Sequence, residues 1–189
     1  MNTYDFDKTI FYPDSSACFY RFCLRRYPGA VVRTLPRTLL TALRYAAGRC
    51  KTKELKEQLF SFLRELEDVD AAVEAFWERN LPRIGAWYLV QRREDDLILS
   101  ASPEFLLAPV CKRLGVELIG TRMDRHSGRI DGENCHDREK VRRFYERDPD
   151  ARTEAFYSDS LSDSPMAEIA ERAFLVKRHR VLPWPGKQN

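Results

Sequence analysis

Apolar residues recur at two different spacings along the chain, and the change between them separates two kinds of structure. Through residues 15–82 they recur at helical intervals, which predicts a small bundle of helices. From about residue 95, short apolar runs alternate with helical patterns, which predicts a mostly parallel sheet covered on both faces. Residues 1–10 are typical of a strand and a loop. The expected fold is therefore α/β, with a three-layer Rossmann-like core and an inserted all-helical segment.

Four helices are expected in the helical stretch. The first covers 17–27 and ends at Pro28-Gly29, and the second begins near Thr34 with Pro36 in its first turn. The third covers 55–66, and the fourth runs from Asp70, as N-cap, to Asn80. The apolar side of the second helix is expected to consist of Leu35, Leu39, Ala42, Leu43 and Ala46.

Polar side chains follow three of the expected strands. Strands are expected at 97–99, 116–120, 155–157 and 174–176, with helices over 103–114, 138–145 and 165–172 between them. Asp5, Ser100 and Asp159 each stand at the carboxyl end of a strand. Because ligands bind at the carboxyl ends of parallel strands, these residues are expected to share one site.

Composition describes a globular protein and excludes several classes. The chain has 189 residues, enough for one core with an insert, and a net charge of +3, too small to indicate nucleic-acid binding. No uncharged apolar run approaches the roughly 20 residues that span a bilayer, and no signal peptide is visible. The five cysteines form no C-x-x-C pair, so we expect a reducing, cytoplasmic location and no disulfide framework.

The strand ends carry residues suited to phosphoryl chemistry. Of Asp5 and Asp7, one carboxylate could attack phosphorus while the other moves the proton. Lys140 could supply a fixed positive charge, and a magnesium ion held by Asp5 and Asp159 could supply the rest. Ser100 could offer its hydroxyl and nearby amides to the phosphate.

Each of these motifs also has a plain structural interpretation. Asp5-Phe6-Asp7 alone fits a polar turn, and Ser100 to Pro103 alone fits a helix N-cap. Lys140 alone fits a solvated helix position, and residues 158–163 fit a polar loop. Their joint occurrence, in order and at strand ends, favours a single site.

Together these motifs resemble those of the haloacid dehalogenase superfamily. The matching stretches are DFDKT at 5–9, SASPE at 100–104, Lys140, and SDSLSDSPM at 158–166. The helical insert resembles the branch containing phosphoserine phosphatase, phosphoethanolamine/phosphocholine phosphatase and phosphatidylglycerophosphatases of bacterial type. Ser158 stands where that family usually has glycine. The resemblance implies a catalytic core of 1–14 and 83–189, and a helical cap of 15–82.

By this resemblance Asp5 is the nucleophile and Asp7 the general acid/base. The implied cofactor is Mg²⁺, bound by the Asp5 carboxylate, the backbone carbonyl of Asp7, and Asp159. A carboxylate at position 7 favours a phosphatase over a dehalogenase or a phosphonate-cleaving enzyme.

The resemblance also implies the residues around the phosphoryl group. Ser100, Ala101 and Lys140 would hold its oxygens. Asp163 would support the metal shell or position Lys140, and Thr9 would orient the loop.

The expected activity is hydrolysis of a small phosphomonoester, with the leaving group chosen by the cap. Phosphoserine-like compounds, amino-alcohol phosphates and lipid head-group phosphates are the expected substrate classes. The alternative is a catalytically weak binding or regulatory protein that kept the fold. Magnesium-dependent turnover discriminates between the two.

The first part of the insert is basic and lacks acidic residues between 20 and 53. A solvated helix face, a cap that attracts anionic substrates, and contact with an anionic membrane surface all fit this pattern. Nucleic-acid binding is not favoured, because no recognition motif accompanies the charge. The basic residues are Arg21, Arg25, Arg26, Arg33, Arg37, Arg44, Arg49, Lys51 and Lys53.

Two remaining features give little indication of function. Cys135-His136 is expected to be an ordinary loop pair, because no second Cys/His cluster accompanies it, and His126 and His179 lie too far away to form a histidine site. The tail LPWPGKQN from Leu182 predicts only a rigid, proline-containing end.

Overall fold

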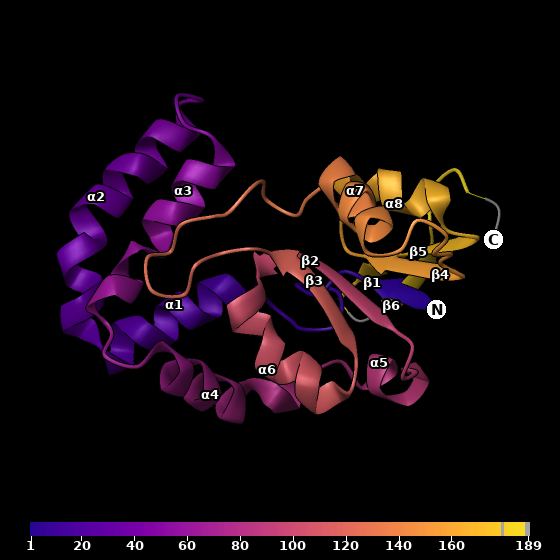
Figure 1. Cartoon of the computed structure of the whole chain (residues 1–189), viewed down its shortest axis with the longest axis horizontal. Coiled ribbons are helices and arrows are strands. Elements are labelled where there is room, and N and C mark those ends of the chain that lie inside the picture. Colours follow the sequence, from indigo (N-terminus) through magenta and orange to yellow (C-terminus); the bar gives the residue numbers. More distant parts are fainter. Residues whose placement is uncertain (179, 188–189) are drawn as a thin grey trace.

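A six-stranded sheet forms the centre of the computed structural model, which describes residues 1–178 and 180–187 (Figure 1). The strand order is β3-β2-β1-β4-β5-β6; the first five strands run parallel, and β6 is antiparallel to β5. The predicted parallel sheet is therefore confirmed. The strands are β1 (Asn2–Tyr4), β2 (Leu97–Pro103), β3 (Glu117–Thr121), β4 (Ala155–Ser158), β5 (Arg172–Lys177) and β6 (Arg180–Pro183).

Helices cover both faces of this sheet, as the three-layer prediction requires. In Figure 1, α5 (Ala86–Gln91) and α6 (Glu104–Leu114) lie below the sheet, and α7 (Arg138–Arg147) and α8 (Ser164–Ile169) lie above it. Alternate residues of β2 point to opposite faces. Ile98 packs into the cluster that contains Leu106 of α6, whereas Leu97 and Leu99 pack with Phe144 of α7.

The order of the strands creates a switch point beside β1. After β1 the chain passes through the helices to β2 and β3 on one side, and then crosses to β4 on the other side. In open α/β sheets the crevice at such a reversal is where ligands bind. Asp5 comes directly after β1, so the topology places it at this crevice.

The helical segment differs from the prediction at three boundaries. The second helix begins at Pro28 rather than near Thr34, since proline is well suited to a first helical position, where its missing N–H costs nothing. The third helix ends at Leu59 and continues as a 3₁₀ turn. The fourth is capped by Asp68, not Asp70, because the Asp68 carboxylate accepts from the Ala71 N–H at 2.8 Å. The elements are α1 (Ser15–Arg26), α2 (Pro28–Ala46), α3 (Thr52–Leu59), η1 (Ser61–Glu65), α4 (Val69–Asn80) and η2 (Leu81–Arg83).

Part of the apolar side expected for α2 faces outward, although Leu35 and Ala42 are half-buried. Leu39 and Leu43 are 56% and 69% exposed, whereas Val31 and Thr38 are buried. The Thr38 hydroxyl donates to the carbonyl of Thr34 at 3.0 Å, so its burial leaves no unsatisfied group. A helical period identifies a face but not which neighbour covers it, and here α3 and η1 pack on the face with Thr38.

Trp77 fixes α4 to the rest of the fold. Its side chain is fully buried, and its indole N–H donates to the carbonyl of Leu106 at 2.6 Å. Phe6 and Phe11, from the loop after β1, meet the indole edge-on at centroid distances of 5.7 and 5.2 Å. The loop that carries the two candidate aspartates therefore rests on a rigid aromatic core.

The last elements include two that the sequence did not predict, α5 and β6. The tail residues Arg180–Pro183 pair with β5, and Trp184 is buried beside Phe156 at a centroid distance of 6.1 Å. Helix α8 begins at Ser164, with Asp163 at the N-cap position. The end of the tail, residues 188–189, and His179 lie outside the described residues. Within the described part, none of the helices combines the length and apolarity needed to cross a membrane.

Candidate active site

Asp5 and Asp7 stand on a tight loop at the end of β1. The N–H of Asp5 donates to the carbonyl of Tyr157 at 2.8 Å, which continues the pairing with β4 for one more residue. The chain then turns through Lys8, which has a positive φ of 56° and donates its N–H to the carbonyl of Phe11 at 2.6 Å. The buried Phe6 side chain points into the core, so Asp5 and Asp7 both point to the cavity.

Lys140 bridges two carboxylates beneath the cavity. Its Nζ donates to Asp5 Oδ1 at 2.6 Å and to Asp163 Oδ2 at 2.7 Å, and its side chain is 1% exposed. Ser158 donates to the same Asp163 oxygen at 2.7 Å, and Thr9 lies 3.4 Å from Asp5 Oδ2. Lys140 is therefore in direct contact with both Asp5 and Asp163.

Helix α7 holds Lys140 in place. Phe144 packs against the sheet, and the guanidinium of Arg143 donates to the carbonyl of Gly120 on β3. The helix starts after Asp137, whose backbone has a positive φ of 56°. These anchors come from a segment distant from β1, so the lysine approaches Asp5 only through the tertiary fold.

Burial and charge shift the proton affinities of this pair. Burial raises the pKa of Asp5 to about 7; the Lys140 ammonium opposes the rise, and the Asp163 carboxylate adds to it. For Lys140, burial alone would lower the pKa, but the Asp5 and Asp163 carboxylates outweigh it and hold the pKa above its ordinary value. The lysine therefore stays charged while Asp5 carries a raised pKa.

Asp7 is held by the start of α1 and by β2. Its carboxylate accepts from the Ser15 N–H at 2.5 Å and from the Ser102 hydroxyl. Burial raises the pKa of Asp7 to about 6, and the nearby Asp14 carboxylate adds to the rise. A carboxyl group with that pKa can give or take a proton near neutral pH.

The residues predicted to hold phosphate lie where β2 leaves its regular pairing. The register between β2 and β3 shifts between Leu99 and Pro103, so Ser100 and Ala101 stand outside the regular ladder. The Ser100 hydroxyl accepts from the Ser102 N–H at 3.1 Å. This irregularity frees polar backbone at the cavity, which suits an anion.

The donor set fits a magnesium ion in chemical type. Asp159 lines the same cavity as Asp5, and burial raises its pKa, with Lys8 and Lys177 opposing. Mg²⁺ is commonly bound by one or two carboxylates together with waters and a substrate phosphate. Across the described residues no cluster of three or more His, Cys, Asp or Glu side chains forms a cage. Two carboxylates and the Asp7 carbonyl would therefore share the ion with water and phosphate.

The structure gathers the predicted residues around one cavity of about 500 Å³. Thr9 is the exception, because it lies behind Asp5 and contacts it instead of lining the cavity. The predicted residues that line it are Asp5, Asp7, Ser100, Ala101, Lys140, Asp159 and Asp163.

Several residues of the site were not predicted from the sequence, among them Ser102 and Lys56. Ser102 contacts Asp7, and its spacing from Ser100, two residues along a strand, was the available signal. Lys56, on α3, donates to the Ala101 carbonyl at 2.9 Å and to the Asn134 amide oxygen at 2.7 Å. Burial lowers the pKa of Lys56, and the acidic group of Asp14 opposes the shift. No local pattern marks this lysine, because its partners lie far along the chain.

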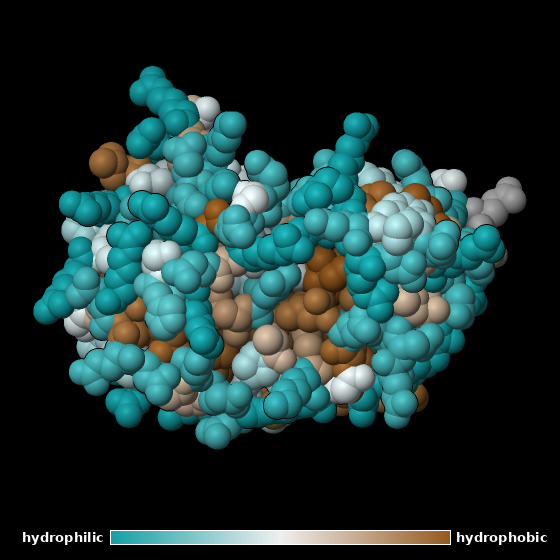
Figure 2. Space-filling view, viewed as in Figure 1, coloured by the Kyte–Doolittle hydropathy of each residue, from teal (hydrophilic) through white to brown (hydrophobic). Residues whose placement is uncertain are grey.

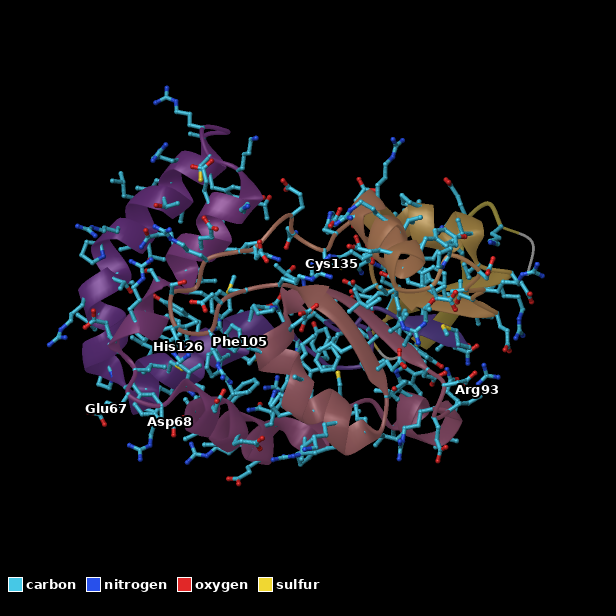
Figure 3. All side chains as sticks on the ribbon, in the orientation of Figure 1. Glu67, Asp68, Arg93, Phe105, His126 and Cys135 are labelled. Carbon is cyan, nitrogen blue, oxygen red and sulfur yellow. The ribbon has the colours of Figure 1, made fainter. Side chains whose placement is uncertain are left out.

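The loop from 122 to 137 connects the sheet to the helical segment. Gly128, at a φ of +72°, packs so closely on the Phe60 backbone that a Cβ would lie 2.6 Å from its carbonyl oxygen. Lys53 donates to the Gly132 carbonyl at 2.6 Å. Figure 3 shows Cys135 on this loop, between the helical segment and α7. Burial raises the pKa of its thiol to about 11, which agrees with an unreactive loop cysteine, whereas His136 lines the cavity.

The fold and these motifs define a haloacid dehalogenase-like hydrolase. The family model for haloacid dehalogenase-like hydrolase matches residues 3–168, and the chain belongs to this family.

A curated relative supports this assignment, and solved structures share the fold. The chain is 30% identical over 181 residues to Protein CicA of Caulobacter vibrioides (strain NA1000 / CB15N), covering 89% of this chain and 82% of the relative. A protein of unknown function from Bordetella pertussis Tohama I has a TM-score of 0.77 at 24% identity, over 92% of this chain and 87% of that one. A phospho-aspartyl intermediate analogue of phosphoserine phosphatase has a TM-score of 0.57 at 16% identity, over 90% and 83%. These structural likenesses show the fold.

Proposed function

We propose that the protein is a magnesium-dependent phosphomonoester hydrolase that works through an aspartyl-phosphate. The observation that carries the proposal is the buried Asp5 carboxylate, 2.6 Å from the Lys140 ammonium, in the cavity that also receives Asp7 and Asp159. The family, and a fold shared with phosphoserine phosphatase, support phosphoester hydrolysis in general.

Asp5 is the nucleophile in this proposal. Lys140 occupies Oδ1, and from the described residues Oδ2 receives only the 3.4 Å contact of Thr9, so Oδ2 has lone pairs available for attack. Attack forms an Asp5–phosphorus bond and breaks the bond from phosphorus to the leaving oxygen. Asp7 gives its proton to that oxygen, which leaves as the alcohol. Asp7 then takes a proton from water, the water oxygen attacks phosphorus, and Asp5 and inorganic phosphate are released.

Positive and polar groups balance the phosphoryl charge. Lys140 supplies a fixed cation, and Ser100 with the Ala101 amide contacts the oxygens from the stretch of β2 where its pairing with β3 is interrupted. A magnesium ion held by Asp5, the Asp7 carbonyl and Asp159 would neutralise further charge on the phosphoryl oxygens.

We assign residues 15–82 to a cap that chooses the leaving group. Helix α3 forms one wall of the cavity with Leu55, Lys56 and Leu59. Asp14, whose charge is opposite to that of Lys56, lines the same cavity. One charge of each sign suits a small zwitterionic leaving group, as in a phosphoserine-like substrate. Amino-alcohol phosphates and lipid head-group phosphates are the other substrate classes that we propose.

Phosphate release from a panel of these compounds tests the function. We expect turnover with magnesium and none with EDTA. One substrate class should be hydrolysed faster than the others. Binding of partners or ligands without turnover of any compound would instead favour a catalytically weak binding or regulatory protein. All five cysteines are free, which supports our proposal of a reducing, cytoplasmic location.

Asp7→Asn is expected to slow the hydrolysis of alkyl phosphates by about 10²–10⁴-fold. The hydrolysis of nitrophenyl phosphate should slow much less, because a nitrophenolate leaves without receiving a proton. The measurement is kcat for both substrates in both proteins. Equal losses for the two substrates would argue against Asp7 as the acid. Ser102→Ala, which removes only the hydroxyl that contacts Asp7, is the control for a shift in carboxylate position.

Metal-free protein is expected to lose stability as the pH rises from about 4 to about 7. The reason is that the pKa of Asp5 is 3.8 in the unfolded chain and about 7 in the folded protein. Below pH 4 both states hold the proton and the contribution is complete; above pH 7 the folded state must bury a charge. Magnesium should restore stability at pH 8 by binding the ionised carboxylate. Denaturant unfolding in EDTA at pH 5 and 8 checks this, with Asp5→Asn expected to show a smaller fall. An equal fall in the variant would exclude Asp5 as its source.

A further inference from the structure

Helix α2 carries a row of exposed apolar side chains. Val32, Leu39, Leu40 and Leu43 are 53%, 56%, 60% and 69% exposed. At 100° per residue they fall on one side of the helix, away from the buried Val31 and Thr38. We call these four residues the leucine ridge. Large apolar side chains that gather on one exposed helix face indicate a surface that is covered by something else.

A second row on the same helix consists of Arg33, Arg37 and Arg44, which we call the arginine ridge. It borders Leu40, and Arg37 and Arg44 lie about 100–160° around the helix from Leu39 and Leu43. Arg33 pairs with Glu65 at 2.6 Å, whereas Arg37 and Arg44 form no ion pair within the part of the chain that the structure describes. These arginines line a cavity of about 460 Å³ together with Arg64 and Arg129, and Glu54, Glu57 and Glu65 of α3 and η1 line it as well. Residues 15–53 contain no acidic side chain, and the five arginines of the cavity outnumber its three glutamates, so this side of α2 has a surplus of positive charge.

The helix lies where a flat surface could reach it. In Figure 1, α2 forms the outer left edge of the molecule, at the end far from α8 and β5. Figure 2 shows this end as a hydrophilic surface interrupted by brown apolar patches. The inner side of α2 packs on α3, which forms a wall of the catalytic cavity. Contact through α2 would hold that cavity beside the surface.

We propose that α2 docks the protein on an anionic lipid surface, with the leucine ridge among the acyl chains and Arg37 and Arg44 at the lipid head groups. Helices that lie in a membrane interface combine an apolar face with a basic flank, and both are present here. A second copy is a poorer occupant, because a two-fold contact through this face would place the two arginine ridges in one interface. The proposal goes beyond phosphoester hydrolysis and does not rest on it.

Cosedimentation of the full chain with vesicles tests the docking surface. We expect binding to phosphatidylcholine vesicles that contain phosphatidylglycerol, little binding to pure phosphatidylcholine, and weakening with added salt. Arg37→Gln/Arg44→Gln should weaken binding about 25-fold, at about fivefold for each charge. Leu39→Ser/Leu43→Ser should weaken it about tenfold or more. The matched control is Leu89→Ser/Val90→Ser on α5, where the side chains are 45% and 88% exposed, and binding should persist.

Several outcomes would overturn the proposal. They are the absence of binding to anionic vesicles at low salt, equal binding to both vesicle types, or unchanged binding by the leucine variant. A dimer that becomes monomeric in the leucine variant, with no vesicle binding, would assign the face to a second copy. Circular dichroism confirms folding, and the arginine variant tests the same face without altering an apolar contact. None of these experiments measures turnover, so their outcome does not depend on whether the proposed catalysis is correct.

Discussion

Asp5→Asn is expected to abolish magnesium-dependent phosphate release, with a loss on the order of 10⁴-fold or more. The amide keeps the size of the side chain and can still contact Lys140, but it cannot form the phosphoenzyme. Initial rates under saturating substrate and magnesium measure the loss. Beryllium fluoride, a phosphoryl mimic, should raise the melting temperature of the native protein with magnesium and leave the variant unchanged.

The control for this loss is Asp150→Asn, which makes the same chemical change at an exposed turn and should keep full activity. A variant at position 5 that retained more than a small fraction of the native rate would exclude a covalent role for Asp5. Stabilisation of that variant by beryllium fluoride would exclude it independently, since the mimic needs the carboxylate oxygen.

The positions of the site residues could be predicted because they depend on a local rule. Asp5, Ser100 and Asp159 each follow an apolar run, and parallel strands bring their carboxyl ends to one edge of a sheet. The structure places all three at the same cavity.

Contacts across the chain could not be predicted in this way. Lys56 reaches Ala101 from a helix 45 positions earlier, and nothing in its own neighbourhood indicates the encounter. The prediction of the buried side of α2 was wrong for a related reason. The period of Leu39 and Leu43 identifies an apolar face, whereas the choice of covered face depends on where α3 and η1 lie.

The strand β6 shows a third limit. Its residues Val181 and Leu182 are 39% and 45% exposed, and prolines stand at positions 183 and 185, so the segment lacks a buried strand pattern. An edge strand forms backbone hydrogen bonds with only one neighbouring strand, so proline is tolerated there. Such a strand forms because β5 offers a free edge, which is a property of the finished sheet.

Lys140→Met is expected to destabilise the fold by about 3–5 kcal/mol at pH 8 and to reduce turnover by about 10²–10³-fold. The ammonium is the shared partner of the Asp5 and Asp163 carboxylates, so its loss leaves two buried acids unpaired. The pKa of Asp5 must then rise further, because the ammonium that opposes the effect of burial is gone, whereas the unfolded chain retains the ordinary value. The stability deficit should therefore shrink as the pH falls from 8 to 5, because the folded variant can take up protons.

Denaturant unfolding of native and variant protein at both pH values, in EDTA, measures this deficit. Lys112→Met on the exposed side of α6 is the matched control and should change the free energy of unfolding by less than about 0.5 kcal/mol. Lys140→Met/Asp163→Asn should recover part of the stability, since one carboxylate is removed with the cation, yet recover no activity. A deficit that is equal at pH 5 and pH 8 would contradict this account, because a lost packing contact has no such pH dependence and a buried unpaired carboxylate must.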